Sequence, residues 1–151
     1  TPVTGLDIGG YYTVTDSKYG NDTALGPLYA GQPLLNMPKY TAGLNMRVSG
    51  DISPTLGGLS YFVNANFRGS TPSTYESSDT AYRNVPSYTK IDTAVEWQNM
   101  LNSEFNLRFY VENLLNNRSP QIYNDLRGFL GSASVIYLPP RMYGVEASVR
   151  F

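Results

Sequence analysis

The sequence predicts an all-β chain whose antiparallel strands form part of the wall of a transmembrane β-barrel. Three observations predict this fold class. Apolar and polar residues alternate with a period of two in six segments, as in strands that have one apolar and one polar face. Every charged residue in these segments lies on the polar face. Long and short connections alternate between the segments, as they do in outer-membrane barrels.

The six predicted strands are, in chain order, 6–15, 40–48, 59–68, 89–98, 105–113 and 142–151. The last has the clearest pattern, because Tyr143, Val145 and Val149 alternate with Glu146 and Arg150. The first has the weakest alternation. Tyr143 and Phe151 are eight residues apart, which in a tilted strand gives roughly 20 Å of height, close to the about 25 Å of the apolar band.

The connections set an expected orientation. Segments 18–39, 69–88 and 115–140 are expected to be long loops without regular structure, whereas 49–58 and 98–104 are expected to be short turns. In outer-membrane barrels the short turns face the periplasm and the long loops face outward. Aromatic residues of the apolar face then fall near the two interfaces, as in an aromatic girdle. Those near the periplasmic side are Tyr61, Trp97 and Phe105, and those near the outer side are Tyr40 and Phe67.

The second short turn also predicts a register between its two strands. Pairing Trp97 with Phe105 would place Lys90 opposite Glu112. The same pairing would place Arg108 diagonal to two carboxylates of the preceding strand, so that opposite charges face one another across the polar side. We expect these charges to line a wet lumen.

The composition excludes several kinds of function. The chain has no His and no Cys, which removes His-based catalysis, His zinc sites and thiolate chemistry. No catalytic residue, metal site or cofactor is therefore expected. The formal net charge of −1 gives no basic footprint for nucleic acid. The chain begins with Thr, and six strands are fewer than the about eight of the smallest membrane barrels. We therefore expect a segment of a larger barrel.

The long loops carry the candidate ligand-binding residues. Tyrosine and arginine together form a good surface for flat, partly anionic ligands, and loops on a rigid scaffold often bind. The candidates are Tyr29, Tyr75, Tyr82, Arg83, Tyr123 and Arg127.

Three short motifs resemble those of TonB-dependent outer-membrane receptors. The segment 110–118, Tyr-Val-Glu-Asn-Leu-Leu-Asn-Asn-Arg, resembles that family's strand followed by Asn-Leu, then Asn or Asp and a basic residue. The segment 137–151 resembles the closing strand of that family. The segment 36–40 resembles the start of one of its strands, where a proline, a basic residue and an aromatic residue follow one another. The pair Ser119-Pro120 departs from the family pattern, in which an aromatic residue often comes soon after the basic residue.

The resemblance implies a bacterial outer-membrane location and a 22-stranded barrel of which residues 1–151 are the C-terminal part. It implies partnership with outer-membrane lipid, an N-terminal plug, the remaining strands and TonB. The implied function is active import of a small-molecule ligand of the siderophore-iron, cobalamin, metal or carbohydrate class. A passive channel or adhesive outer-membrane barrel is the first alternative, and a soluble ligand-binding β-barrel or sandwich is the second.

The same resemblance gives the last strand a second role. Strands of this kind that end in Phe are the signal read by the barrel-assembly machinery. The matching residues are Gly144, Ala147, Val149 and Phe151. The physical basis is strand addition, in which an open edge with alternate apolar side chains pairs with another edge.

Overall fold

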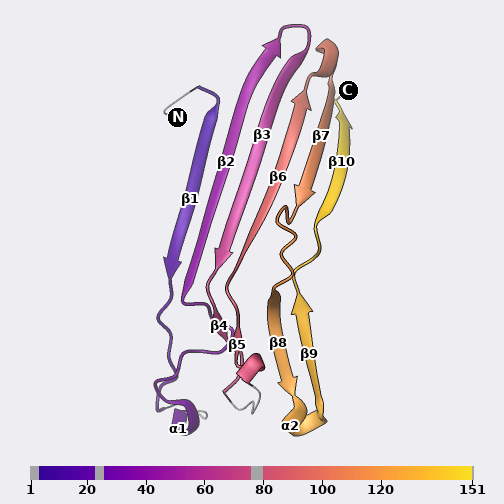
Figure 1. The fold of residues 1–151 in the computed structure, drawn as a ribbon. Helices are drawn as coiled ribbons and strands as arrows, with labels where there is room; N and C mark the ends of the chain where they lie inside the picture. Colours follow the sequence, from indigo (N-terminus) through magenta and orange to yellow (C-terminus); the bar gives the residue numbers. More distant parts are fainter. Residues whose placement is uncertain (1–3, 23–25, 76–79, 151) are drawn as a thin grey trace.

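Six long strands form one antiparallel sheet in the order β1-β2-β3-β6-β7-β10 (Figure 1). The computed structural model describes residues 4–22, 26–75 and 80–150. The strands are β1 (Leu6–Val14), β2 (Tyr40–Ser53), β3 (Gly57–Arg68), β6 (Tyr88–Gln98), β7 (Phe105–Glu112) and β10 (Met142–Val149). Each long strand pairs with the next long strand along the chain, which confirms the predicted antiparallel, up-and-down arrangement.

The long connections contain regular elements, so the expectation of loops without regular structure was wrong in part. They contain two small antiparallel pairs and short helices at one end of the sheet (Figure 1). These elements are α1 (Gly26–Tyr29), β4 (Thr71–Pro72), η1 (Thr80–Tyr82), β5 (Asn84–Val85), β8 (Pro120–Leu126), α2 (Arg127–Leu130) and β9 (Ser132–Tyr137). A tight turn does not join β8 to β9. The chain instead passes through α2 and the left-handed Gly131 (φ 66°), so no short-range hairpin signal marks the pair.

The first short turn is shorter than predicted, because β2 continues to Ser53. Its last residues are mostly polar, so the alternation that predicts a strand fades before the pairing does. The turn itself is 54–56, followed by Gly57 with a φ of 81°. A β-carbon at Gly57 would lie 2.1 Å from the carbonyl oxygen of Gln98, so only glycine fits.

The predicted register between β6 and β7 was wrong by two residues. Trp97 pairs with Leu107, and Glu96 therefore lies directly opposite Arg108. The cause is the turn η2 (Met100–Asn102), which is bounded and interrupted by left-handed residues, among them Asn99 and Leu101. Backbone angles of this kind set the register of a hairpin and cannot be read from the strand pattern alone.

The shifted register changes the expected ion pairs. Lys90 does not reach across to Glu112; its Nζ lies 3.0 Å from Asp92 Oδ2 on the same strand. Arg108 Nη1 lies 2.9 Å from Glu146 Oε2 on β10. The charges remain on the predicted polar face, because a shift of two residues leaves each side chain on its original side.

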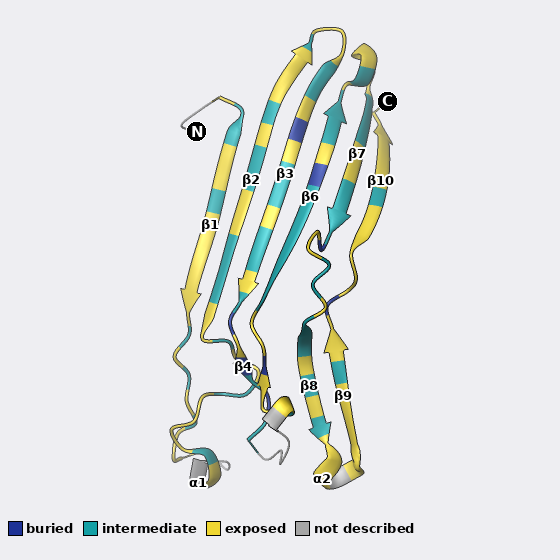
Figure 2. Cartoon of the chain, viewed as in Figure 1, coloured by how far each residue is buried: buried dark blue, intermediate teal, exposed yellow. Residues whose placement is uncertain are grey.

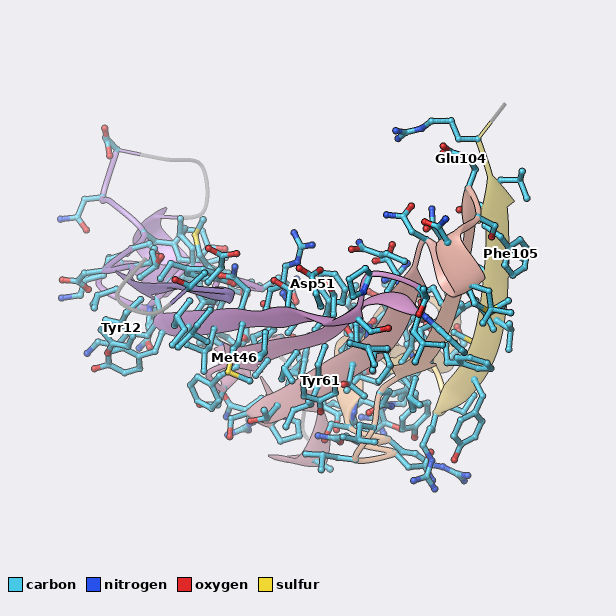
Figure 3. All side chains as sticks on the ribbon, turned by 90° about the horizontal axis from the view of Figure 1, so that it is seen from above. Tyr12, Met46, Asp51, Tyr61, Glu104 and Phe105 are labelled. Carbon is cyan, nitrogen blue, oxygen red and sulfur yellow. The ribbon has the colours of Figure 1, made fainter. Side chains whose placement is uncertain are left out.

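The sheet is curved, and its two faces differ in polarity. Seen end-on, Tyr12, Met46 and Tyr61 lie on the convex side, whereas Asp51 and Glu104 lie on the concave side (Figure 3). The apolar side chains of the convex face are largely uncovered, with Tyr143 71% exposed and Ile8 60% exposed. No helix among the described residues combines the length and apolarity needed to cross a membrane.

Aromatic residues lie near both ends of the convex face. At the short-turn end the Trp97 indole Nε1 donates a hydrogen bond of 2.6 Å to the carbonyl of Leu56. At the other end the ring of Tyr40 stacks on that of Tyr12, with centroids 6.3 Å apart. The sequence predicted both Trp97 and Tyr40 at these positions.

The wall itself contributes little core. Most residues of the long strands are intermediate or exposed (Figure 2). Two wall residues, Ser60 and Ala94, are buried. The others that are buried lie around the long connections and include Thr71, Ser73, Val85, Asn113 and Leu138. The described chain therefore packs most tightly at the end where the long connections meet.

Candidate ligand-binding site in the long connections

Five of the six predicted ligand-binding residues take part in two aromatic clusters. Tyr29 and Tyr75 form one cluster together with Tyr19. Tyr82, Tyr123 and Arg127 form the other. The sixth residue, Arg83, follows η1; its side chain is exposed, and its carbonyl accepts a hydrogen bond of 2.8 Å from the N–H of Ser73.

The first cluster joins two connections that lie far apart in the sequence. The ring centroid of Tyr29 is 5.8 Å from that of Tyr19 and 5.4 Å from that of Tyr75. The Tyr75 hydroxyl donates to the carbonyl of Pro33. Burial, and secondarily the neighbouring Tyr19, raises the pKa of the Tyr75 phenol. The phenol therefore stays protonated at neutral pH and keeps its donor role. The sequence interpretation missed Tyr19, although it lies in the same long connection as Tyr29.

The second cluster combines two rings with a cation. The rings of Tyr82 and Tyr123 are 5.3 Å apart and tilted by 59°. The guanidinium carbon of Arg127 lies 4.6 Å from the centre of the Tyr82 ring, within cation–π range. Burial, then Tyr137 and Tyr82, raises the pKa of the Tyr123 phenol.

A carboxylate that the sequence interpretation missed completes this cluster. Arg127 Nε and Nη2 each lie 2.8 Å from an oxygen of Asp125, so the contact is bidentate. The Asp125 side chain is only 7% exposed. The positive charge of Arg127 is thus balanced locally while its guanidinium plane stays fixed. The arrangement offers flat π faces and phenol hydroxyls, which suits a flat ligand with polar edges.

The middle connection, 69–88, holds the other two long connections together. Toward the first, the Pro72 carbonyl accepts a hydrogen bond of 2.7 Å from the N–H of Asn36. Toward the third, the Ser73 hydroxyl donates to the carbonyl of Tyr123 at 2.9 Å. The two aromatic clusters therefore belong to one packed layer rather than to three independent loops.

Asn113 ties the β8–β9 pair to the wall. Its side chain is fully buried, and its Nδ2 donates to the carbonyls of Asn117 (2.8 Å) and Pro139 (2.7 Å). Its Oδ1 accepts from the N–H of Asn117 at 2.9 Å, and its own N–H donates to Asp92 Oδ1 at 2.8 Å. Asn113 has a φ of 51°, in the left-handed region that Asn adopts more readily than most residues. These contacts give a physical reason for the Asn-Leu-Leu-Asn-Asn motif.

The concave face of the wall is polar and hollow. Its lining includes charged residues from β1, β2, β6, β7 and β10, namely Asp7, Arg47, Asp92, Arg108, Glu112 and Glu146. Within the described ranges no group of three or more carboxylates is placed to hold a metal ion.

Three of the four residues of the expected assembly signal lie on β10. Gly144 is on the concave side and pairs with Tyr110. Ala147 and Val149 are exposed and pair with Leu107 and Phe105 on the apolar face. Phe151 lies outside the described residues.

Comparison with solved structures shows the same fold. The chain is similar to the ferric yersiniabactin uptake receptor FyuA from Yersinia pestis, with a TM-score of 0.78 and 23% identity over 99% of this chain. It is also similar to BauA, the ferric preacinetobactin receptor from Acinetobacter baumannii (TM-score 0.68, 18% identity, 97% of this chain). A third similar structure is the siderophore receptor PiuA from the same organism (0.65, 20%, 96%). The chain spans only 21%, 20% and 19% of these three proteins.

A family model matches the sequence itself. No curated protein shows a significant sequence match. The model described as "TonB dependent receptor-like, beta-barrel" matches residues 4–114, which include five of the six wall strands. The chain therefore belongs to the TonB-dependent receptor family of outer-membrane β-barrels.

Proposed function

We propose that this chain is the C-terminal part of the barrel domain of an active outer-membrane importer that takes up ferric siderophores with energy supplied through TonB. The match of residues 4–114 to the family model carries the proposal. The three similar structures support the substrate class, because one is described as a siderophore receptor and the other two as receptors for ferric yersiniabactin and ferric preacinetobactin. Transport rather than an enzymatic reaction is the proposed activity of the whole protein.

The two faces of the wall suggest the partners. The convex face presents exposed Leu, Val, Ile and aromatic side chains that suit outer-membrane lipid. The concave face is polar and suits contact with a plug domain. The outer edges of β1 and β10 pair with no described strand and suit the remaining strands of a barrel. TonB would act through a region outside this chain.

The second aromatic cluster is the proposed ligand contact. Tyr82, Tyr123 and Arg127 come from two connections and are held within one packed layer. Tyr29 and Tyr75 form a second proposed contact surface, and Arg83 adds an exposed cation beside Tyr82. Such a layer at the outer mouth of a barrel would capture a flat complex before import.

β10 is the proposed recognition strand for barrel assembly. Its uncovered edge can pair with another edge, and Ala147 and Val149 present alternate apolar side chains beside it. Deleting Phe151 from the full-length protein is expected to reduce the amount inserted in the outer membrane. Normal insertion after the deletion would contradict this role.

An uptake assay with the full-length receptor tests the transport proposal. Radioactive iron bound to yersiniabactin or to preacinetobactin is offered to cells with and without TonB. TonB-dependent accumulation supports active import. Uptake that persists without TonB would indicate a passive channel, and no uptake of either complex would contradict the proposed substrate class.

A triple variant tests the ligand contact. Replacing Tyr82, Arg83 and Arg127 together by Ala is expected to weaken binding of the imported complex at least tenfold. Arg118→Ala is the matched control, because Arg118 is an exposed cation in the same connection as Arg127. Unchanged affinity in the triple variant would place the ligand elsewhere.

A further inference from the structure

Among the described strands, β8 pairs with β9 alone, and side chains bind two of its other carbonyls. The carbonyls of Gln121 and Tyr123 accept hydrogen bonds from Arg68 Nη1 (3.2 Å) and from the Ser73 hydroxyl (2.9 Å). Gln121 lies at the register shift between Pro120 and Ile122, and Tyr123 follows two residues later, so the two donors bind neighbouring carbonyls of this strand.

Both donors belong to well-anchored parts of the chain. Arg68 is the last residue of β3 and pairs with Thr41 on β2 and with Tyr88 on β6, so it is part of the wall. Ser73 is 7% exposed and follows β4 directly. Its N–H donates to the carbonyl of Arg83 at 2.8 Å, which fixes it beside η1.

The residue that Ser73 holds is itself part of the second aromatic cluster. Tyr123 presents its carbonyl to Ser73 and its ring to Tyr82. Tyr82 in turn lies under the guanidinium of Arg127, which α2 contributes at the end of β8. The position of β8 therefore decides whether the two connections bring their rings together.

We propose that Arg68 and Ser73 are positioning residues that dock β8 against the wall and so preassemble the Tyr82–Tyr123–Arg127 ligand contact. This inference rests on the proposed function only for the identity of the ligand; the docking of β8 does not depend on it. Without the two donors, these carbonyls would bond to water and the β8–β9 pair would sample undocked positions. Apparent affinity would then fall in proportion to the docked fraction.

Two measurements on the full-length receptor test the proposal. The 151 residues contain no Cys, so spin labels can be placed through cysteines at Ser87 and Ser132, both exposed and on opposite sides of the docking contact. The distance distribution between them reports docking without any ligand. Binding of radioactive iron–yersiniabactin and iron–preacinetobactin gives the affinity, and the maximal uptake rate is recorded separately.

The test variant is Arg68→Met with Ser73→Ala. We expect a broader, longer distance distribution, an affinity about tenfold weaker and an unchanged maximal uptake rate per inserted receptor. In a chain with Arg68 intact, Ser73→Thr keeps the hydroxyl and should therefore keep β8 docked, unlike Ser73→Ala. Ser70→Ala is the matched control, because Ser70 is exposed in the same connection.

Each outcome decides the proposal. An unchanged distance distribution overturns the docking role, whatever the ligand does. A broadened distribution with unchanged affinity overturns the positioning role. If the parent receptor binds neither iron complex, the proposed substrate class fails, while the distance measurement still decides whether Arg68 and Ser73 dock β8. If the double variant no longer inserts in the membrane but Ser73→Ala does, the same two measurements are made on Ser73→Ala and decide the proposal there.

Discussion

The phenol ring of Tyr110 on β7 covers the α-carbon of Gly144 on β10. The two residues are direct cross-strand partners on the concave face. A β-carbon at Gly144 would lie 2.1 Å from Cζ and 2.2 Å from Oη of that ring. Tyr11 covers Gly43 in the same way, where a β-carbon would lie 2.2 Å from Cε1. In both pairs the aromatic ring fills the space left by glycine and shields the exposed backbone.

Replacing Gly144 by Ala should destabilise the β7–β10 pairing. The Tyr110 ring must leave its position, and a clash of this kind costs about 1–3 kcal/mol in the free energy of unfolding. The measurement is the urea midpoint of the full-length barrel in lipid. Gly50→Ala is the control, because a β-carbon there meets no atom within 4 Å. Removing the ring with Tyr110→Ala should relieve the clash in the double variant. Equal midpoints for Gly144→Ala and Gly50→Ala would contradict the packing argument.

Replacing Asn113 by Ala should detach the base of the β8–β9 pair. The substitution removes the side-chain hydrogen bonds to the carbonyls of Asn117 and Pro139 and from the N–H of Asn117, and it places Ala at a φ of 51°. The three lost hydrogen bonds are worth about 1 kcal/mol each, so we expect a loss of about 3 kcal/mol in local stability. Hydrogen exchange of the Asn117 amide measures it. Asn124→Ala on the exposed side of β8 is the control and should leave that exchange rate unchanged.

Replacing Trp97 by Phe should loosen the first short turn. Phe keeps an aromatic ring at the rim but removes the donor that reaches the Leu56 carbonyl at 2.6 Å. The expected cost is about 1 kcal/mol, the net worth of an ordinary hydrogen bond. Faster exchange of amides in 54–58, with unchanged exchange at the far end of β3, is the expected readout. If these amides are as well protected from exchange as in the parent, the Trp97–Leu56 hydrogen bond contributes nothing to the stability of the turn.

The second aromatic cluster should weaken at high pH. Burial, then Tyr137 and Tyr82, raises the pKa of Tyr123 above the ordinary value of 10.0. The folded state therefore holds this proton more tightly than the unfolded state. The resulting stability is complete below pH 10.0 and is lost as the pH rises through the raised folded pKa.

An ultraviolet difference titration of the parent against Tyr123→Phe isolates this phenol. Tyr137→Phe should lower the pKa of Tyr123 toward its ordinary value, because it removes the second of the named causes. Tyr88→Phe, which alters a wall tyrosine at the start of β6, is the control. If the Tyr123 phenol titrates at or below the ordinary value, burial does not raise its pKa and the prediction is wrong.

Local pattern was enough to locate the wall strands. The alternation in 105–113 and 142–151 depends only on which side chains face lipid or lumen, and β7 and β10 lie within those ranges. The β8–β9 pair was missed because its strands meet through α2, and because the donors that bind β8 come from the end of β3 and from another connection. Five of the six candidate ligand residues fall in aromatic clusters, but the partners Tyr19 and Asp125 were not identified.

The sequence by itself determined the fold class, the two faces of the sheet and the end at which the long connections lie. Those features follow from side-chain polarity and spacing along one strand at a time. Only the tertiary structure decided the β6–β7 register, the Arg108–Glu146 pair and the docking of β8 by Arg68 and Ser73. The reason is physical: a register depends on the backbone angles of the turn, and contacts between connections depend on where the wall places their ends.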